Sequence, residues 1–313
     1  MKVLITSNSF GKFDKTAKEK LVSQGWEIQT NPYGKIMDEQ EMKQVIKDVD
    51  AVILGSDPVT ESVLKSANRL KIISRYGVGI DNIDVHAAEK RGITITRTVN
   101  ANADAVADYT IGLMLSTLRH LPQADEKLQQ GIWDKKTGLD LCHKVVGVFG
   151  LGAIGKGVVR RLRGFGCTII AYDPYADSEF CAENNVALYE PAAIFKEADV
   201  ITLHFPGNAD GKPFISREEL GLMKQSAVIV NTARASLVDE KAVLDAVEQG
   251  KLYGYGTDVF SSEPAIPSYF LNKGNVVLSP HMAAVSVGAI NRMSQMAVDH
   301  ILEFFEKESE NKS

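Results

Sequence analysis

Short apolar runs alternate with longer, polar segments of helical character along almost the whole chain. Runs with the composition of buried strands lie at residues 3–6, 51–54, 72–74 and 93–96, and then at 145–149, 168–172, 200–204, 227–231, 254–257 and 276–278. Continuous apolar strands separated by helices are typical of parallel sheets covered on both faces. The pattern predicts an α/β protein with two doubly wound parallel-sheet domains, Rossmann- or flavodoxin-like, and a cleft between them.

Two helical segments decide how we divide the chain. The segment near 102–120 lies between the two strand sets, and its apolar residues occupy more than one face, so we expect a helix buried on several sides. The last segment, about 286–307, follows the final strand and is long enough to return to the first domain. We therefore expect a discontinuous domain of residues 1–98 plus 289–313 and a second domain of residues 99–288.

Composition excludes several classes of protein. A chain of 313 residues with 44% hydrophobic and 24% charged residues suits two globular domains. A net charge of -5 and the lack of a basic run argue against nucleic acid or an anionic membrane as partner. Three cysteines without a CxxC pair indicate reduced thiols and no metal site. With no cleavage pattern at the start and no apolar stretch long enough for a bilayer, we expect a cytoplasmic protein.

A glycine-rich sequence follows the predicted strand 145–149 and opens a helical pattern. It reads Gly150-Leu151-Gly152-Ala153-Ile154-Gly155. In such a loop the first glycine allows a tight turn, the second lets the backbone approach a pyrophosphate, and the third lets helix and strand pack closely. Unpaired N–H groups at the start of the helix would then face the phosphates. The loop therefore predicts a dinucleotide site.

Asp173 closes the next predicted strand, 18 residues after Gly155. A carboxylate at about this interval accepts hydrogen bonds from the ribose hydroxyls and repels a 2′-phosphate. Pro174 and Tyr175 follow it, with no arginine to receive such a phosphate. The sequence therefore favours NAD over NADP, although a solvated turn aspartate is the alternative explanation.

Three candidate chemical groups follow predicted strands in the last third of the chain. Arg234 lies in NTARAS, Glu263 in TDVFSSEP and His281 in LSPHMAA. Reduction of a 2-oxo acid requires a cation for the carboxylate and the carbonyl, which a planar arginine supplies, and a proton donor that titrates near neutrality, which a histidine supplies. A carboxylate on the far ring nitrogen would fix the tautomer and favour the imidazolium. His204, also after a strand, is expected to line the cofactor site without acting chemically.

In the order and spacing of these motifs the chain resembles the D-isomer-specific 2-hydroxyacid dehydrogenases over essentially its whole length, with phosphoglycerate dehydrogenase-like members the most similar. The resemblance implies an NAD-dependent enzyme with a substrate domain (1–98 plus 289–313) and an NAD-binding Rossmann domain (99–288). It implies substrate binding and catalysis by Arg234, an acid–base pair of Glu263 and His281, and a place for Asp258 near the nicotinamide. Members of this family typically dimerise through the cofactor domain, so we expect a homodimer.

A second loop, after the strand 72–74, has the composition of an anion site. It runs Arg75-Tyr76-Gly77-Val78-Gly79, and successive N–H groups in such a turn can form a nest for an anion. The resemblance implies that this loop binds the substrate carboxylate and that Arg75 faces a substrate phosphate. A turn with a surface arginine is the alternative.

Some positions depart from the family pattern. Ala235 and Ser236 stand where two glycines are common, and Gly55 stands where phosphoglycerate dehydrogenases tend to carry a second arginine. The resemblance still implies the interconversion of a D-2-hydroxy acid and its 2-oxo acid, with 3-phosphoglycerate as the first candidate substrate. Reduction of hydroxypyruvate, glyoxylate or another 2-oxo acid is the alternative, and an idle NAD-sensing corepressor is a third, less favoured one.

Overall fold

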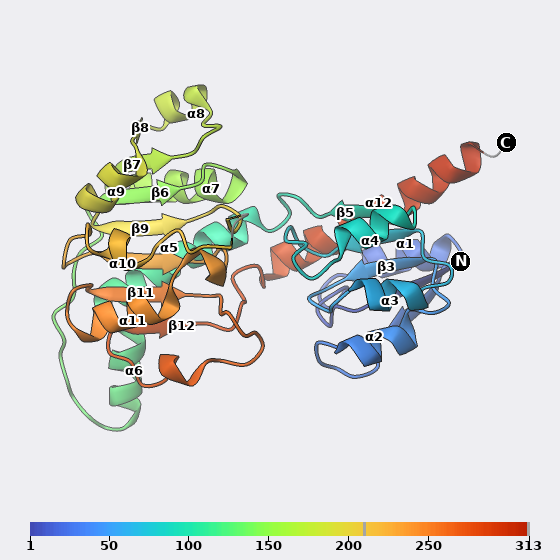
Figure 1. Cartoon of the computed structure of the whole chain (residues 1–313), viewed down its shortest axis with the longest axis horizontal. Helices are drawn as coiled ribbons and strands as arrows, with labels where there is room; N and C mark the ends of the chain where they lie inside the picture. The colour runs from blue at the N-terminus through green and yellow to red at the C-terminus, as the bar shows by residue number, and fades with distance from the viewer. Residues whose placement is uncertain (209–210, 312–313) are drawn as a thin grey trace. The chain divides into compact units, whose positions relative to one another are not determined.

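The computed structural model describes residues 1–208 and 211–311, so the predicted domain end at Ser313 lies outside the described residues. The chain divides into two compact units, Met1–Asn102 with Val285–Ser313, and Ala103–Ala284. Each is built around one parallel sheet and is described by itself (Figure 1). The predicted pair of doubly wound parallel sheets is confirmed.

The first unit has a five-stranded sheet in the order β2-β1-β3-β4-β5, which is the flavodoxin-like order. Its strands are β1 (Lys2–Ile5), β2 (Glu27–Thr30), β3 (Ala51–Leu54), β4 (Ile72–Arg75) and β5 (Thr94–Arg97). Its helices are α1 (Thr16–Ser23), α2 (Glu39–Val45), α3 (Glu61–Ser66), α4 (Val85–Lys90) and α12 (Val287–Glu310). β1, β3 and β4 are almost entirely buried, whereas β2 and β5 form the half-exposed edges.

The last helix, α12, belongs to this first unit, because it packs against α1 and β4. Ser286 caps its start by accepting a hydrogen bond from the Ala289 N–H at 3.2 Å. The Tyr76 hydroxyl donates to the Ile290 carbonyl at 3.0 Å, and the rings of Trp26 and Phe305 meet edge to face at 5.0 Å. The two ends of the chain thus share one core.

The second unit has a seven-stranded sheet in the order β12-β11-β10-β9-β6-β7-β8. The strands are β6 (Val145–Phe149), β7 (Thr168–Tyr172), β8 (Val186–Leu188), β9 (Val200–Leu203), β10 (Val228–Asn231), β11 (Gly254–Thr257) and β12 (Val276–Leu278). The first and fourth strands, β6 and β9, are neighbours, as in a Rossmann sheet. The two strands are parallel, but successive strands are added in opposite directions on either side of them. Open α/β sheets bind ligands beyond the carboxyl ends of the strands at such a point.

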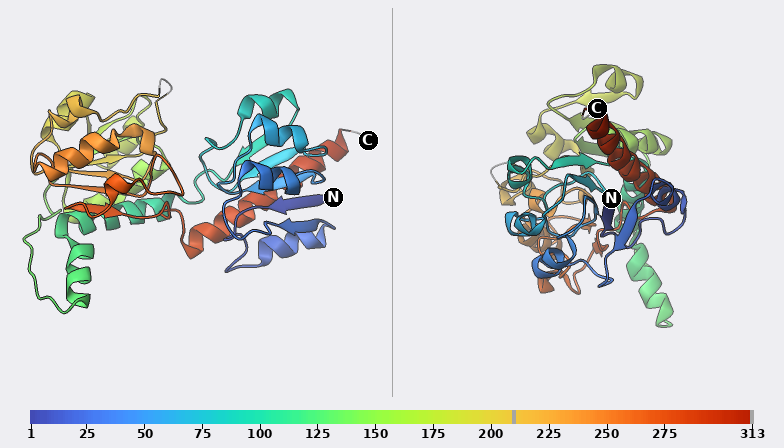
Figure 2. Two further views of the ribbon diagram at one scale, coloured as in Figure 1. Left: turned by 60° about the horizontal axis from the view of Figure 1, so that its bottom comes forward. Right: turned by 90° about the vertical axis from the view of Figure 1, so that its right-hand side faces the viewer.

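The helices described in this unit are α5 (Ala103–Arg119), α6 (Leu121–Gln129), α7 (Ala153–Leu162), α8 (Ser178–Glu183), α9 (Pro191–Glu197), α10 (Arg217–Leu220) and α11 (Glu240–Glu248). Three 3₁₀ turns among the described residues are η1 (Arg163–Phe165), η2 (Ala235–Leu237) and η3 (Ser268–Phe270). α5 lies directly on the sheet because β11 presents glycines to it. A Cβ on Gly256 would lie 2.9 Å from Thr117 Oγ1. Figure 2 shows α6 and the following loop projecting away from the sheet of this unit.

The part of the chain that the structure describes contains no helix long and apolar enough to cross a membrane. Across the same residues, no group of three or more His, Cys, Asp or Glu side chains is arranged to hold a metal ion.

Candidate active site

The glycine loop joins β6 to α7, and two of its glycines are required by close contacts. Gly150 has a φ of +92°, and a Cβ there would lie 2.5 Å from the His204 carbonyl oxygen. A Cβ on Gly155 would lie 1.9 Å from the Gly150 carbonyl oxygen. Gly152 differs, because its Cβ would meet no atom within 4 Å. The backbone at Gly152 is therefore open to a ligand at the start of α7, as a pyrophosphate requires.

Asp173 lies just after β7 and holds the glycine loop in place. Its Oδ2 accepts a hydrogen bond from the Leu151 N–H at 2.6 Å, and its Oδ1 accepts one from the Tyr175 N–H at 2.8 Å. An ionised carboxylate has about four acceptor sites, so each oxygen keeps capacity for a ribose hydroxyl. The open backbone at Gly152 and this carboxylate fit an NAD molecule. Ala153 and Ile154 begin α7, and their predicted contact with the cofactor stays a prediction.

His204 follows β9, and its carbonyl oxygen lies against Gly150. Its Nε2 lies 2.9 Å from Thr202 Oγ1. Burial lowers the pKa of His204 to about 3, so this imidazole is neutral near pH 7. A neutral ring can make polar contacts but cannot serve as the proton donor. Its predicted contact with the cofactor stays a prediction.

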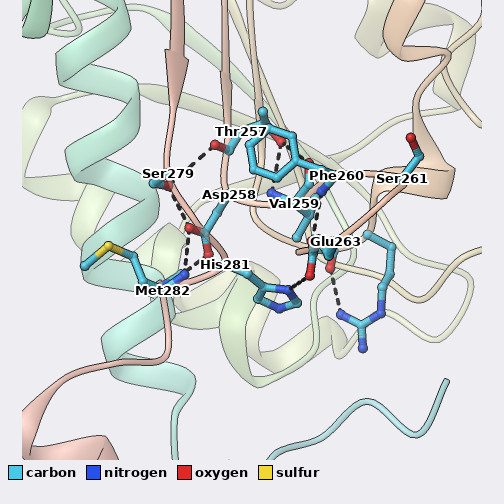
Figure 3. Close-up of polar contacts among 12 residues, drawn as sticks. Thr257, Asp258, Val259, Phe260, Ser261, Glu263, Ser279, His281 and Met282 are labelled. Carbon is cyan, nitrogen blue, oxygen red and sulfur yellow. Dashed lines mark hydrogen bonds and ion pairs between the residues drawn. The ribbon is translucent and has the colours of Figure 1, made fainter. Parts of the chain in front are cut away.

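Glu263 and His281 meet although 18 residues separate them. His281 Nδ1 lies 2.6 Å from Glu263 Oε2, and Glu263 Oε1 accepts the Phe260 N–H at 2.9 Å (Figure 3). An ionised carboxylate only accepts hydrogen bonds, so the hydrogen of this bond belongs to Nδ1. Nε2 is then the ring position left to exchange a proton. Both side chains are partly accessible, with exposed fractions of 33% for Glu263 and 49% for His281.

The surroundings of Glu263 keep its carboxylate charged. Burial alone would raise its pKa, but the hydrogen bonds from His281 and the Phe260 N–H outweigh that effect. The positive charges of His281 and Arg234 act in the same direction, so the pKa of Glu263 lies below its ordinary value. The same finding places the charge of Arg234 within electrostatic reach of the pair.

Asp258 fixes the loop that carries His281. This carboxylate is 1% exposed. Its Oδ1 accepts hydrogen bonds from Ser279 Oγ at 2.6 Å and the Met282 N–H at 2.9 Å, and its Oδ2 accepts one from the Ala283 N–H at 2.8 Å (Figure 3). These bonds hold both sides of His281. The predicted contact of Asp258 with the cofactor stays a prediction beside this observed anchoring role.

Arg234 sits on a turn that is held by a fully buried amide. The Asn231 side chain, at the end of β10, donates to the Arg234 carbonyl at 2.9 Å and accepts from the Ala233 N–H at 3.0 Å. Arg234 Nη1 donates to the Ala233 carbonyl at 2.7 Å. Sequence reasoning did not identify Asn231 as important. Its place before the turn, inside the NTAR motif, was the available signal.

In the first unit, Arg75 shapes its own loop. Its Nε donates to the Gly79 carbonyl at 2.7 Å, and its Nη1 donates to the carbonyls of Tyr76 at 2.6 Å and Leu54 at 3.1 Å. The Gly77 N–H donates to Thr98 Oγ1 at 2.8 Å. The N–H groups of Val78 and Gly79 make no hydrogen bond to another described residue, so they are available to an anion as the nest hypothesis requires. Binding of substrate by residues 75–79 stays a prediction.

Comparison with known proteins decides the family. The family described as "D-isomer specific 2-hydroxyacid dehydrogenase, NAD binding domain" matches residues 111–283. A hydroxypyruvate reductase of Thermotoga maritima is 38% identical over 271 residues, which cover 85% of this chain and 88% of the relative. This chain belongs to the D-isomer specific 2-hydroxyacid dehydrogenases. The predictions of NAD as cofactor and of an NAD-dependent oxidoreductase are confirmed at the level of this family.

Two further proteins show how far the similarity extends. A D-3-phosphoglycerate dehydrogenase of Methanocaldococcus jannaschii is 43% identical over 249 residues, or 78% of this chain, and the chain spans about half of that relative's length (48%). The solved structure of an Aquifex aeolicus D-lactate dehydrogenase complexed with NAD and lactic acid is 25% identical, with a TM-score of 0.84, and the match covers 98% of this chain and 96% of that one.

The environment of Asp173 generates a prediction about cofactor choice. The unchanged chain should have a higher kcat/KM with NADH than with NADPH, because the carboxylate repels a 2′-phosphate. Asp173→Asn keeps an acceptor for the loop but removes the charge, so it should lower this preference. Adding Tyr175→Arg should lower it further by supplying a cation. Steady-state kinetics with both cofactors measure this, and a wild-type preference for NADPH would contradict the role of Asp173.

Proposed function

We propose that the chain interconverts a D-2-hydroxy acid and its 2-oxo acid, with Arg234, Glu263 and His281 as its catalytic residues. The observation that carries this proposal is the 2.6 Å contact between His281 Nδ1 and Glu263 Oε2, with the Arg234 charge close enough to lower the pKa of Glu263. A corepressor without activity has no need of such a pair. We also propose the division of labour in which residues 1–98 plus 289–313 bind substrate and residues 99–288 bind NAD, and a cytoplasmic location.

Each residue has a distinct chemical task in this proposal. When bound, NAD accepts the hydride in oxidation, and its reduced form delivers the hydride in reduction. In reduction, His281 gives the proton on Nε2 to the carbonyl oxygen, while Glu263 holds the proton on Nδ1 and stabilises the charged ring. Arg234 binds the substrate carboxylate and polarises the carbonyl. In oxidation, neutral His281 takes the hydroxyl proton through the same nitrogen.

The pair generates a prediction about pH. Glu263→Gln keeps the shape but removes the charge beside the imidazolium, so the fall of the reduction rate at alkaline pH should move to lower pH. His281→Ala should lower kcat on the order of 10²- to 10⁴-fold. Arg234→Ala should raise KM for the 2-oxo acid and lower kcat together.

Profiles of kcat against pH for each variant, with KM for NADH as the control, measure these effects. The KM for NADH should be nearly unchanged. Near-normal turnover of His281→Ala, or an unmoved profile of Glu263→Gln, would contradict the assignment.

For the substrate, we propose 3-phosphoglycerate as the first candidate. Two observations support it: the chain is 43% identical to a D-3-phosphoglycerate dehydrogenase, and Arg75 lies in the loop that we expect to bind an anion. A specific observation favours a second candidate, an unphosphorylated 2-oxo acid such as hydroxypyruvate or glyoxylate. Arg75 donates three hydrogen bonds to backbone carbonyls. Gly55 stands where a second arginine is common, so this position supplies no second cation for a phosphate. The hydroxypyruvate reductase relative also matches over 88% of its length.

Arg75→Ala distinguishes these substrates. If Arg75 binds a phosphate, its removal should weaken kcat/KM for 3-phosphoglycerate roughly 10- to 150-fold, the value of a charge-assisted hydrogen bond, and leave kcat/KM for glyoxylate nearly unchanged. Assays of both substrates in both variants measure the difference. Equal losses on the two substrates would show that Arg75 only supports the loop.

We also propose a homodimer. Its support is the segment formed by α6 and the loop after it, which projects from the second unit (Figure 2) and exposes the apolar side chains Leu121, Leu128, Ile132 and Trp133, the last at 80%. Isolated segments of this kind are typical of interfaces.

Light scattering at micromolar concentration tests the dimer. The unchanged chain should have the mass of two chains, and Trp133→Ser should shift the equilibrium toward the monomer, because it removes a large apolar contact. Tyr175→Ser, at another exposed aromatic (92%), serves as the matched control and should leave the mass unchanged. A monomeric wild type would contradict the proposal.

A further inference from the structure

A buried carboxylate outside the proposed catalytic set holds the segment that carries Glu263. Glu240 is the first residue of α11 and is 7% exposed. It makes no ion pair with another described residue, so hydrogen bonds alone stabilise its carboxylate. Burying a carboxylate is unfavourable unless such bonds compensate it, so these hydrogen bonds hold the donor groups in their positions.

Among the described residues, the hydrogen-bond partners of the Glu240 carboxylate lie in one stretch of chain. Glu240 Oε1 accepts the Ser261 N–H at 3.0 Å, and Oε2 accepts the Ser261 hydroxyl and the Tyr269 hydroxyl, each at 2.7 Å. Residues 261–266 between these partners are exposed and contain no helix or strand. Glu263 lies within this stretch, so the bonds to Glu240 and the packed rings of Phe260 and Phe270 fix the backbone on both sides of Glu263.

Two neighbouring peptide groups link the two carboxylates. The Phe260 N–H donates to Glu263, and the next N–H along the chain, that of Ser261, donates to Glu240. A displacement of this stretch therefore changes both hydrogen bonds together. The Glu240 carboxylate makes no hydrogen bond to His281 or Glu263, so its influence on them passes through Ser261 and Tyr269.

We propose that Glu240 is a positioning residue for the reaction: by anchoring Ser261 and Tyr269 it holds Glu263 at hydrogen-bonding distance from His281. The expected effect of Glu240 on turnover rests on the proposed function. Its expected effect on the Glu263–His281 contact does not.

The test therefore has a structural readout that does not depend on activity. A short hydrogen bond from His281 Nδ1 to a carboxylate gives a proton resonance at low field, which Glu263→Gln should remove and thereby assign. Glu240→Gln should move this resonance upfield or broaden it, because the amide offers fewer acceptor sites and no charge. Asp239→Asn is the matched control, since Asp239 caps the same helix through the Ala242 N–H and has no bond to the 261–269 stretch; it should leave the resonance unchanged.

Turnover gives the second readout. Glu240→Gln should lower kcat about tenfold to a hundredfold, as a small misplacement of a reacting group does, with KM for NADH unchanged. Tyr269→Phe removes one bond while the carboxylate stays, so it keeps the test available if Glu240→Gln does not fold; it should give a smaller loss and a smaller movement of the resonance.

An unmoved resonance in folded Glu240→Gln or Tyr269→Phe overturns the positioning role, as does an equal effect of Asp239→Asn. If the resonance responds to Glu240 while His281→Ala keeps its turnover, the proposed function fails and the anchoring of Glu263 by Glu240 stands.

Discussion

The loops of the candidate site depend on one kind of interaction: a buried or half-buried side chain accepts hydrogen bonds from main-chain N–H groups. Asp258 does this just after His281, Asn231 before Arg234, Glu240 before Glu263, and Asp173 at the glycine loop. A doubly wound sheet places its ligand-binding residues beyond the ends of strands, where no regular backbone pairing fixes them. Side-chain acceptors supply the rigidity that the sheet itself cannot provide at that edge.

The departures from the family pattern have local consequences that the structure makes visible. Ser236 stands where a second glycine is common, and its hydroxyl oxygen would lie 2.7 Å from a Cβ on Gly207. The space that a glycine would leave at 236 is thus taken, and a side chain at position 207 would require the Ser236 hydroxyl to move. Arg75 shows the same principle in the other unit, since a residue that the family pattern associates with substrate also supports the loop around it.

Much of this fold could be predicted because its central strands are buried on both faces and therefore consist almost wholly of apolar residues. The strands that the pattern did not indicate, β2 and β8, are sheet edges whose side chains are mostly accessible, so they lack an apolar run. α6 was missed because Pro122 suggested the end of a helix, whereas it occupies the first turn of the next one, where a missing N–H costs nothing.

The candidate catalytic residues of the site could be predicted from the sequence, but the residues that hold them in place could not. Motif order and spacing identified Arg234, Glu263 and His281, and the structure brings Glu263 and His281 into contact. The anchoring contacts of Asp258, Asn231 and Glu240 could not be predicted, because each joins segments that only the folded chain places together. Glu240 in particular has no local sequence signal beyond its position at the start of a helix, where an acidic residue is common for other reasons.

The central claim is that Glu263 acts on the reaction through His281. A double-mutant cycle on kcat for 2-oxo acid reduction, comparing wild type, Glu263→Gln, His281→Ala and the double variant, tests it most directly. If Glu263 acts through His281, its substitution should cost nothing further once the imidazole is gone, so the double variant and His281→Ala should have the same kcat. A double variant whose loss equals the product of the two single losses would show that the two residues act independently and would contradict the account.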